Sequence, residues 1–278
     1  MSDAVSMTHS FDMHESGLRG EVRGEGAPVV LLHGLTATRR YVLQGSGLLE
    51  RRGFSLASYD ARGHGESAPA PDPTAYEYSD LLGDLRLVLD LLGLERPVLA
   101  GSSMGAATAL AHALEDPGAV SALVQVTPAY SGAPRDEADE LDEWDALAAA
   151  LDGGDINAFV ELSGVNSIPA TLRETARTAV RQRLERHRDL GAVADALRVV
   201  PRSAAFDGLD VLESLDVPVL VVGSRDDTDP GHPLRVAEEY ARRLPRVRLV
   251  VEGEGESPLA WRGTSLSKAI AEFLADPP

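Results

Sequence analysis

The chain has 278 residues, enough for one large domain with a buried core, and it contains no cysteine. The lack of cysteine excludes disulfides, thiol catalysis and cysteine-based zinc sites. Its 26 basic and 44 acidic residues leave a net charge of −18, which would repel nucleic-acid phosphates and anionic lipid heads. We therefore expect neither nucleic acid nor a membrane as a partner. Residues 1–4 lack the basic start of a signal peptide and no apolar run has the length of a membrane span, which favours a cytoplasmic location.

In the first half of the chain, strand-like segments alternate with helical patterns. The segments expected as strands are 8–14, 18–24, 28–32, 54–59, 97–100 and 119–126, and those expected as helices are 38–51, 78–92 and 104–114. The first two strands read as a hairpin, and the third is a continuous apolar run of the kind that is buried on both faces. This alternation predicts an α/β fold with a mainly parallel sheet and helices on both faces.

The strand pattern is interrupted between about residues 128 and 205. Four helical segments occupy this interval, at 139–151, 157–162, 171–187 and 191–199. The closing elements are a strand at 217–222, a helix at 233–243, a strand at 247–251 and a helix at 264–274. We therefore expect a core built from residues 1–130 and 206–278, with a helical lid at 131–205.

The acidic run between residues 136 and 145 overlaps the first of these four helical segments. Its acidic residues alternate with alanine, leucine and Trp144, a pattern typical of the solvated face of a helix rather than of a binding tail.

The motif with the clearest chemical meaning lies at residues 101–105. The run Gly-Ser-Ser-Met-Gly fits Gly-x-Ser-x-Gly, centred on Ser103, between the expected strand 97–100 and the expected helix 104–114. A nucleophile elbow requires this strand, turn and helix, and its glycines let the strand and helix approach closely around a strained serine. We therefore predict that Ser103 is a nucleophile whose φ is positive.

Two other segments accompany this motif. Residues 31–35 read Leu-Leu-His-Gly-Leu, and residues 59–67 read Tyr-Asp-Ala-Arg-Gly-His-Gly-Glu-Ser. In type and in order, these segments resemble the α/β-hydrolase fold family, in its serine-nucleophile, lid-bearing esterase and enol-lactonase-like branch. The resemblance covers most of the chain outside the expected lid. A serine nucleophile, rather than an aspartate, argues against the dehalogenase and epoxide-hydrolase branches.

The resemblance implies roles for several groups. The backbone amides of Leu35 and Met104 would form the oxyanion hole. His33 would be structural, and the turn at 59–67 would be pinned by side-chain hydrogen bonds, although its His64 could also line the pocket. The family places its triad acid three residues after a glycine that follows the resumed strand. That position is Asp226, with the neighbouring Asp227 and Asp229 as alternatives.

The sequence departs from the family where the catalytic histidine is expected. The family reads Gly-x-Gly-His-Ser-Pro after its last strand, whereas residues 253–258 read Gly-Glu-Gly-Glu-Ser-Pro and place Glu256 at that position. One candidate base is Glu256 itself, with a pKa raised by burial and by a nearby Asp226. The other is His232, the last histidine of the chain, although a histidine between two prolines is more often a helix-entry residue.

Three kinds of function fit these observations. The first is a carboxylic-ester-type hydrolase, in which Ser103 attacks a small-molecule ester, thioester or lactone and Asp226 with Glu256 handles protons. The second is a ligand-binding protein that has lost turnover, as in the plant gibberellin receptors of this fold, because loss of a triad base costs on the order of 10⁶ in turnover. The third is a lyase or isomerase that uses only the oxyanion hole. We favour the hydrolase.

We expect no cofactor. The chain has no Gly-x-x-x-x-Gly-Lys-Ser/Thr loop, and Gly45-x-Gly47 lacks the third glycine of a dinucleotide-binding turn. We likewise expect no metal site.

Overall fold

The computed structural model describes residues 8–13 and 16–278, so the expectations for residues 1–4 and for His14 fall outside the described residues. Eight strands form one sheet in the order β1-β2-β4-β3-β5-β6-β7-β8. The strands are β1 (Thr8–Met13), β2 (Leu18–Arg23), β3 (Ala27–Leu32), β4 (Phe54–Asp60), β5 (Val98–Ser102), β6 (Ala122–Val126), β7 (Val219–Gly223) and β8 (Val247–Val251). Strand β2 pairs antiparallel with β1 and β4, and all other pairs are parallel. The predicted hairpin and mainly parallel sheet are confirmed.

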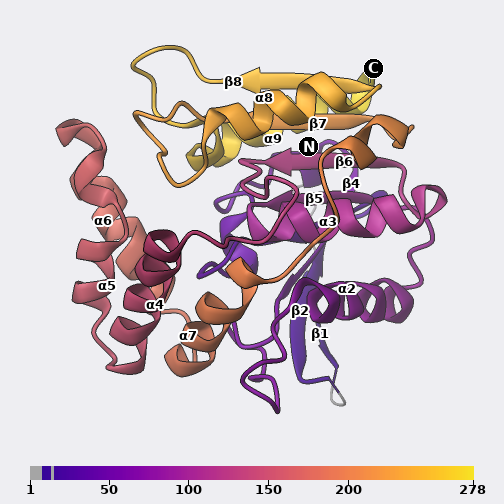
Figure 1. Ribbon diagram of the computed structural model, residues 1–278. Coiled ribbons are helices and arrows are strands. Elements are labelled where there is room, and N and C mark those ends of the chain that lie inside the picture. The colour runs from indigo at the N-terminus through magenta and orange to yellow at the C-terminus, as the bar shows by residue number, and fades with distance from the viewer. Residues whose placement is uncertain (1–7, 14–15) are drawn as a thin grey trace, which may run out of the picture.

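Helices cover both faces of this sheet (Figure 1). The five that do so are α1 (Leu48–Arg51), α2 (Tyr78–Leu92), α3 (Met104–Glu115), α8 (Leu234–Arg243) and α9 (Gly263–Ala275). Residues of α2, α3 and α8 pack on one face in a cluster that contains Val30, while α1 and α9 pack on the other face with Val29. Strand β3 is therefore buried on both sides, as its continuous apolar run predicted.

The expected helix at 38–51 is wrong. The structure has a 3-10 turn at Arg39–Tyr41 and only the single turn of α1. Between them, Gln44 and Gly45 have φ values of 49° and 75°. Such left-handed backbone cannot continue a right-handed helix, and the glycines at 45 and 47 make the break inexpensive.

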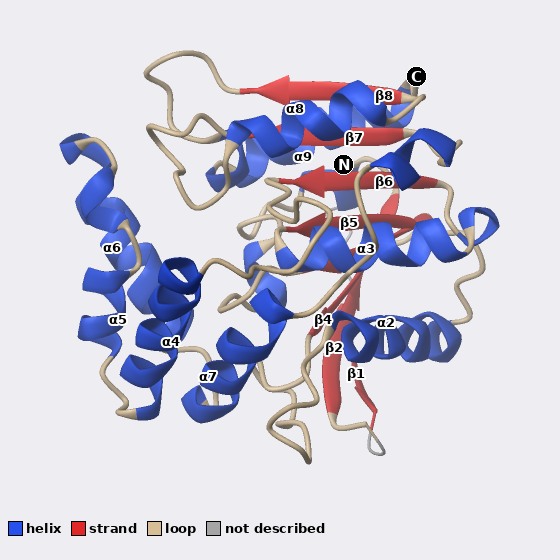
Figure 2. Cartoon of the chain, viewed as in Figure 1, coloured by secondary structure: helices blue, strands red, loops and turns tan. Residues whose placement is uncertain are grey.

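The interval between β6 and β7 contains four helices, as predicted. They are α4 (Ala138–Asp152), α5 (Ile156–Leu162), α6 (Ala170–Leu184) and α7 (Leu190–Val199). In Figure 2 they lie beyond the carboxyl ends of the parallel strands rather than on a face of the sheet. They share a small apolar core that includes Leu151, Phe159 and Leu197. We call residues 131–205, which contain these helices, the helical insertion.

Within residues 8–13 and 16–278, no helix combines the length and the apolar character needed to cross a bilayer.

Candidate active site

Ser103 occupies the turn between β5 and α3. Its φ is 51° and its ψ is −109°, a backbone conformation that costs a non-glycine residue about 1–3 kcal/mol. A side chain at Gly101 would collide with the carbonyl of Gly105, and one at Gly105 would collide with the carbonyl of Leu32. The predicted positive φ of Ser103 is therefore confirmed, and both glycines of the motif are required by close backbone packing.

Two backbone amides are free beside Ser103. Met104 begins α3, so its N–H has no partner within the helix. Within the described residues, no hydrogen bond engages the N–H of Leu35. Gly34 brings this amide close, because a Cβ placed on Gly34 would lie 3.4 Å from the Cβ of Ser103. Two unpaired donors next to a strained serine are the arrangement that can hold an oxyanion.

Ser103, Leu35 and Met104 line one cavity. Aromatic and aliphatic side chains make up most of its remaining wall, together with one cation; the other lining residues are Tyr78, Ala129, Tyr130, Ala133, Arg135, Trp144, Val200 and Pro201. The helical insertion supplies Arg135, Trp144 and Val200 to this wall. The cavity therefore lies between the sheet edge and the insertion, and it is mainly apolar.

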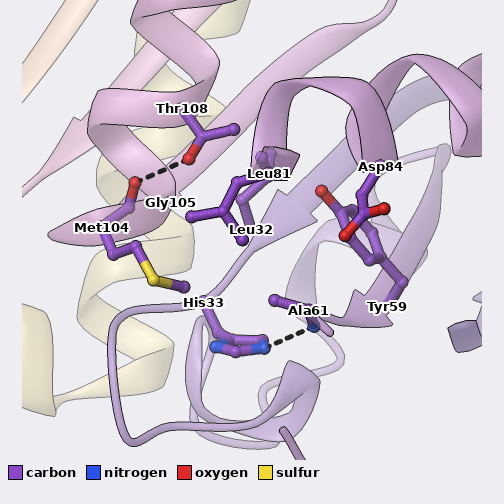
Figure 3. Close-up of a pocket in the computed structure, with 9 residues that line it drawn as sticks. All are labelled: Leu32, His33, Tyr59, Ala61, Leu81, Asp84, Met104, Gly105 and Thr108. Carbon is purple, nitrogen blue, oxygen red and sulfur yellow. Dashed lines mark hydrogen bonds between the residues drawn. The ribbon is translucent and has the colours of Figure 1, made fainter. Parts of the chain in front are cut away.

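A second, smaller cavity adjoins the first turn of α3 (Figure 3). Most of its polar side chains are engaged: His33 Nε2 accepts from the amide of Ala61 at 2.9 Å, and Thr108 donates to the carbonyl of Met104 at 3.0 Å. Asp84 accepts two hydrogen bonds of 2.7 Å from Arg62. These contacts engage three of the four polar side chains in the cavity wall; the fourth, that of Tyr59, forms no hydrogen bond within the described residues.

The turn at 59–67 is held by Asp60, whose carboxylate is fully buried. It accepts from the amides of Arg39 and Glu66 at 2.7 and 3.0 Å and pairs with the Arg39 guanidinium. Ser67 donates to the Asp60 carbonyl at 2.6 Å. The prediction of a turn pinned by side-chain hydrogen bonds is confirmed, as is the structural role of His33.

Neither Asp226 nor Glu256 is among the described residues that line this serine cavity, and neither is His232. Asp226 is exposed and accepts from the amide of Leu234 at 2.7 Å, so it caps the start of α8. Glu256 is also exposed and accepts from the amide of Gly253 at 3.1 Å. Within the described residues, no hydrogen bond joins either carboxylate to the other or to Ser103. The arrangement that the resemblance implies is therefore not assembled in this conformation.

Asp229 and His232, named above as alternatives to Asp226 and Glu256, do form a pair. His232 Nδ1 lies 2.8 Å from Asp229 Oδ1, in the loop between β7 and α8. Asp229 is 8% exposed, whereas Asp227 is exposed and forms no such contact. Burial disfavours the charged imidazole, but the adjacent Asp229 outweighs burial, so the pKa of His232 is raised above 6.5. An imidazole held at Nδ1 by a carboxylate has its Nε2 available as a proton acceptor.

Sequence reasoning missed the role of Glu252. This carboxylate is 5% exposed and accepts from the amide of Arg225 at 2.6 Å and from the hydroxyl of Thr228 at 3.3 Å. It thereby ties the loop after β7 to the loop after β8. Its position directly after the last strand was the only signal in the sequence.

Sequence reasoning also missed Arg135, which directly precedes the acidic run at residues 136–145. Its guanidinium pairs with Glu140 at 2.7 Å and donates to the carbonyl of Ala129 at 3.1 Å, while its side chain lines the serine cavity. Trp144 was expected only as part of a solvated helix, and it lines the same cavity.

Comparisons with known proteins identify the family of this chain. A family model described as the alpha/beta hydrolase fold matches residues 27–261. The putative carbamate hydrolase RutD of a Caulobacter strain is 30% identical over 267 residues, which cover 93% of this chain and 96% of that protein. The AB hydrolase superfamily protein YisY of Bacillus subtilis is 24% identical over 90% of this chain and 92% of its own length.

A solved structure shows the same fold. The enol-lactonase of Burkholderia xenovorans superposes with a TM-score of 0.79 at 20% identity, over 96% of this chain and all of that one. The family-model match over residues 27–261, with the 30% identity to the Caulobacter protein along most of both chains, establishes that the chain belongs to the α/β-hydrolase fold family.

Proposed function

We propose that this protein hydrolyses a small-molecule ester, thioester or lactone through an acyl-enzyme at Ser103. The observation that carries the proposal is the strained elbow of Ser103, together with the unpaired amides of Leu35 and Met104, two residues that line the same cavity as Ser103. Such amides stabilise the charge that develops on a carbonyl oxygen when a hydroxyl attacks it. A relative that shares most of its length with this chain is named a putative carbamate hydrolase, which is the same class of acyl chemistry.

The apolar wall of the cavity favours a substrate with a hydrocarbon acyl or alcohol part. Tyr78, Tyr130 and Trp144 offer surfaces against which such a group can pack. We take the helical insertion, residues 131–205, to be a lid that excludes water from Ser103. Arg135 is the one charged residue in the cavity wall and would orient a polar group of the substrate.

His232, held by Asp229, is the base that the geometry favours. It would accept the Ser103 proton on Nε2 as the hydroxyl attacks, and return that proton to the leaving group as the tetrahedral intermediate collapses. Water would then attack the acyl-enzyme by the same route. Ser103 Oγ has no hydrogen-bond partner among the described residues, so the transfer needs a bridging water or a shift of the loop that carries His232. Hydrogen bonds of this kind commonly tighten only when substrate is bound.

Glu256 is the base that the family alignment favours, with Asp226 as its partner. In this role its carboxylate would have to leave the amide of Gly253 and turn toward Ser103. A ligand-binding protein without turnover is the second candidate function. It is favoured by a single observation, that neither Asp226 nor Glu256 contacts the serine.

Hydrolysis of p-nitrophenyl acetate by the wild type and by Ser103→Ala separates these functions. The proposal predicts turnover that is lost in Ser103→Ala, with both proteins folded by circular dichroism. A wild-type rate equal to that of Ser103→Ala would instead support the ligand-binding protein. In that case, the binding of apolar ligands to the protein would be measured next, by calorimetry.

A further inference from the structure

One histidine of the helical insertion reaches the core loops beside Ser103. His187 follows α6, and its Nδ1 accepts from the amide of Gly65 at 2.8 Å. Its Nε2 lies 2.9 Å from the carbonyl of Thr36. Because Nδ1 must be bare to accept from an amide, Nε2 carries the proton and donates to Thr36. The amide of Arg188 adds a third link, to the Gly65 carbonyl at 3.0 Å.

The Thr36 contact matters because Thr36 follows the candidate oxyanion donor. Residues 34–37 form a tight turn closed by the amide of Ala37 on the carbonyl of Gly34 at 3.0 Å. Thr36 sits at its third position with a φ of 65°, which a threonine adopts only at a cost of about 1–2 kcal/mol. The direction of the Leu35 amide depends on this turn, which needs external contacts to hold a strained residue in place.

His187 also completes a cluster of three histidine rings in tilted and edge-to-face contact. The ring centroids of His33 and His64 are 5.1 Å apart, and those of His64 and His187 are 5.6 Å apart. His33 lies directly before the turn, and His64 lies in the turn at 59–67. This cluster of rings therefore joins the insertion to both loops that border the oxyanion donor.

We propose that His187 is a positioning residue that fixes the turn at 34–37, and thus the Leu35 amide, to the helical insertion. It acts through Thr36 and does not contact the reacting atoms. The proposal rests on the proposed function of Ser103, since a positioned Leu35 amide matters only if an oxyanion forms there. It also couples the lid to the chemistry, because the amide is held in place only while the insertion is docked.

Three variants isolate the two hydrogen bonds. His187→Ala and His187→Phe remove both bonds, and the phenylalanine keeps a planar aromatic ring of slightly larger volume at this position. His187→Gln retains an amide donor and an adjacent acceptor at nearly the same separation as the two ring nitrogens. Arg181→Ala is the matched control, because Arg181 lies in the insertion and its exposed side chain donates a hydrogen bond to Asn157, at 2.6 Å, rather than to either turn.

Steady-state hydrolysis of p-nitrophenyl acetate provides the first measurement. A misplaced donor weakens transition-state binding, so we expect kcat to fall on the order of 10-fold in His187→Ala and His187→Phe with little change in KM. His187→Gln should recover most of that loss, and Arg181→Ala should match the wild type. Wild-type kcat in folded His187→Phe would overturn the proposal, as would a His187→Gln variant as impaired as His187→Phe.

Hydrogen exchange at the amides of Ala37 and Gly65 provides a measurement that does not depend on activity. We expect both amides to exchange faster in His187→Phe and to return to wild-type protection in His187→Gln. If the wild type hydrolyses no ester, the proposed function fails, and the exchange result alone then decides the link between His187 and the turn. Unchanged exchange in His187→Phe would show that His187 does not hold the turn.

Discussion

Asp229 holds the imidazole of His232 by a 2.8 Å contact between Oδ1 and Nδ1, within a loop that follows the strand next to the edge of the sheet. This is how a carboxylate orients the base in a serine triad. The family places a histidine after the last strand, where this chain has Glu256. A histidine held by a carboxylate is therefore present, but it lies on a different loop.

His232→Ala should lower kcat for p-nitrophenyl acetate on the order of 10²-fold if His232 is the base, the low end of general-base contributions. Only the neutral imidazole accepts a proton, and the pKa of His232 is raised above 6.5. The wild-type rate should therefore fall as the pH drops through a value above 6.5. In Asp229→Asn this limb should move to lower pH, because the charge that favours imidazolium is gone. A pH profile identical in wild type and Asp229→Asn would rule out this pair as the base.

Glu256→His tests the alignment with the family. If position 256 is that of the triad base, an imidazole there would meet Asp226 and accept the Ser103 proton near neutral pH. Hydrolysis of p-nitrophenyl acetate should then rise by roughly 10²-fold. Glu256→Gln, which removes the charge without adding a base, is the control. It should leave the rate unchanged if His232 is the general base. No gain in a folded Glu256→His protein would mean that this loop does not reach Ser103.

Limited proteolysis tests the helical insertion as a lid. Helices α4 to α7 have their own small core and lie off the sheet, so we expect their connecting loops to be cut before the strands are. The first cleavage sites, located by mass spectrometry, should fall within residues 131–205. An apolar ligand in the cavity should slow this cleavage, because Trp144 and Val200 would contact it. First cuts in the sheet half of the chain would count against the lid.

The stability of the protein should fall in mild acid because of its buried histidines. Burial is the main reason that the pKa values of His33 and His64 lie below 6.5, and it lowers the pKa of His187 to about 4. Between pH 6.5 and 4 the unfolded chain binds protons that the folded state does not, so stability present above pH 6.5 is lost as the pH falls toward 4. From His187 alone, we expect the free energy of unfolding to drop by roughly 2 kcal/mol between pH 7 and 5.

Urea denaturation at several pH values measures this effect. The titratable and charged groups that act on His187 are His33 and Arg183, which oppose its protonation, and Asp60, which favours it. His187→Gln should flatten the dependence of unfolding free energy on pH in this window. An unchanged slope in His187→Gln would contradict the assignment.

The elbow could be predicted from the sequence because its signals are local. The glycines at 101 and 105, the apolar run before them and the helical pattern after them all lie within one short segment. The helix expected at 38–51 does not form, because Gln44 and Gly45 adopt left-handed backbone in its middle. Local backbone freedom decided the structure there.

The remaining contacts of the site depend on distant parts of the chain. His187 forms hydrogen bonds with Gly65 and Thr36, which are 122 and 151 positions away in the sequence. No local sequence pattern could therefore predict these contacts. Asp229 and His232 were each named as alternatives, but their pairing depends on the loop conformation. Arg135 and Trp144 reach the cavity only because the helical insertion folds back over the sheet edge.

Trapping the acyl-enzyme tests the central claim most directly. The protein would be mixed with p-nitrophenyl acetate, quenched in acid within the first turnover, and digested for peptide mass spectrometry. The account predicts one acetyl group on the peptide that contains Ser103, with none in Ser103→Ala. An acetyl group on another residue, or hydrolysis with no adduct at Ser103 at any quench time, would contradict the assignment of Ser103 as the nucleophile.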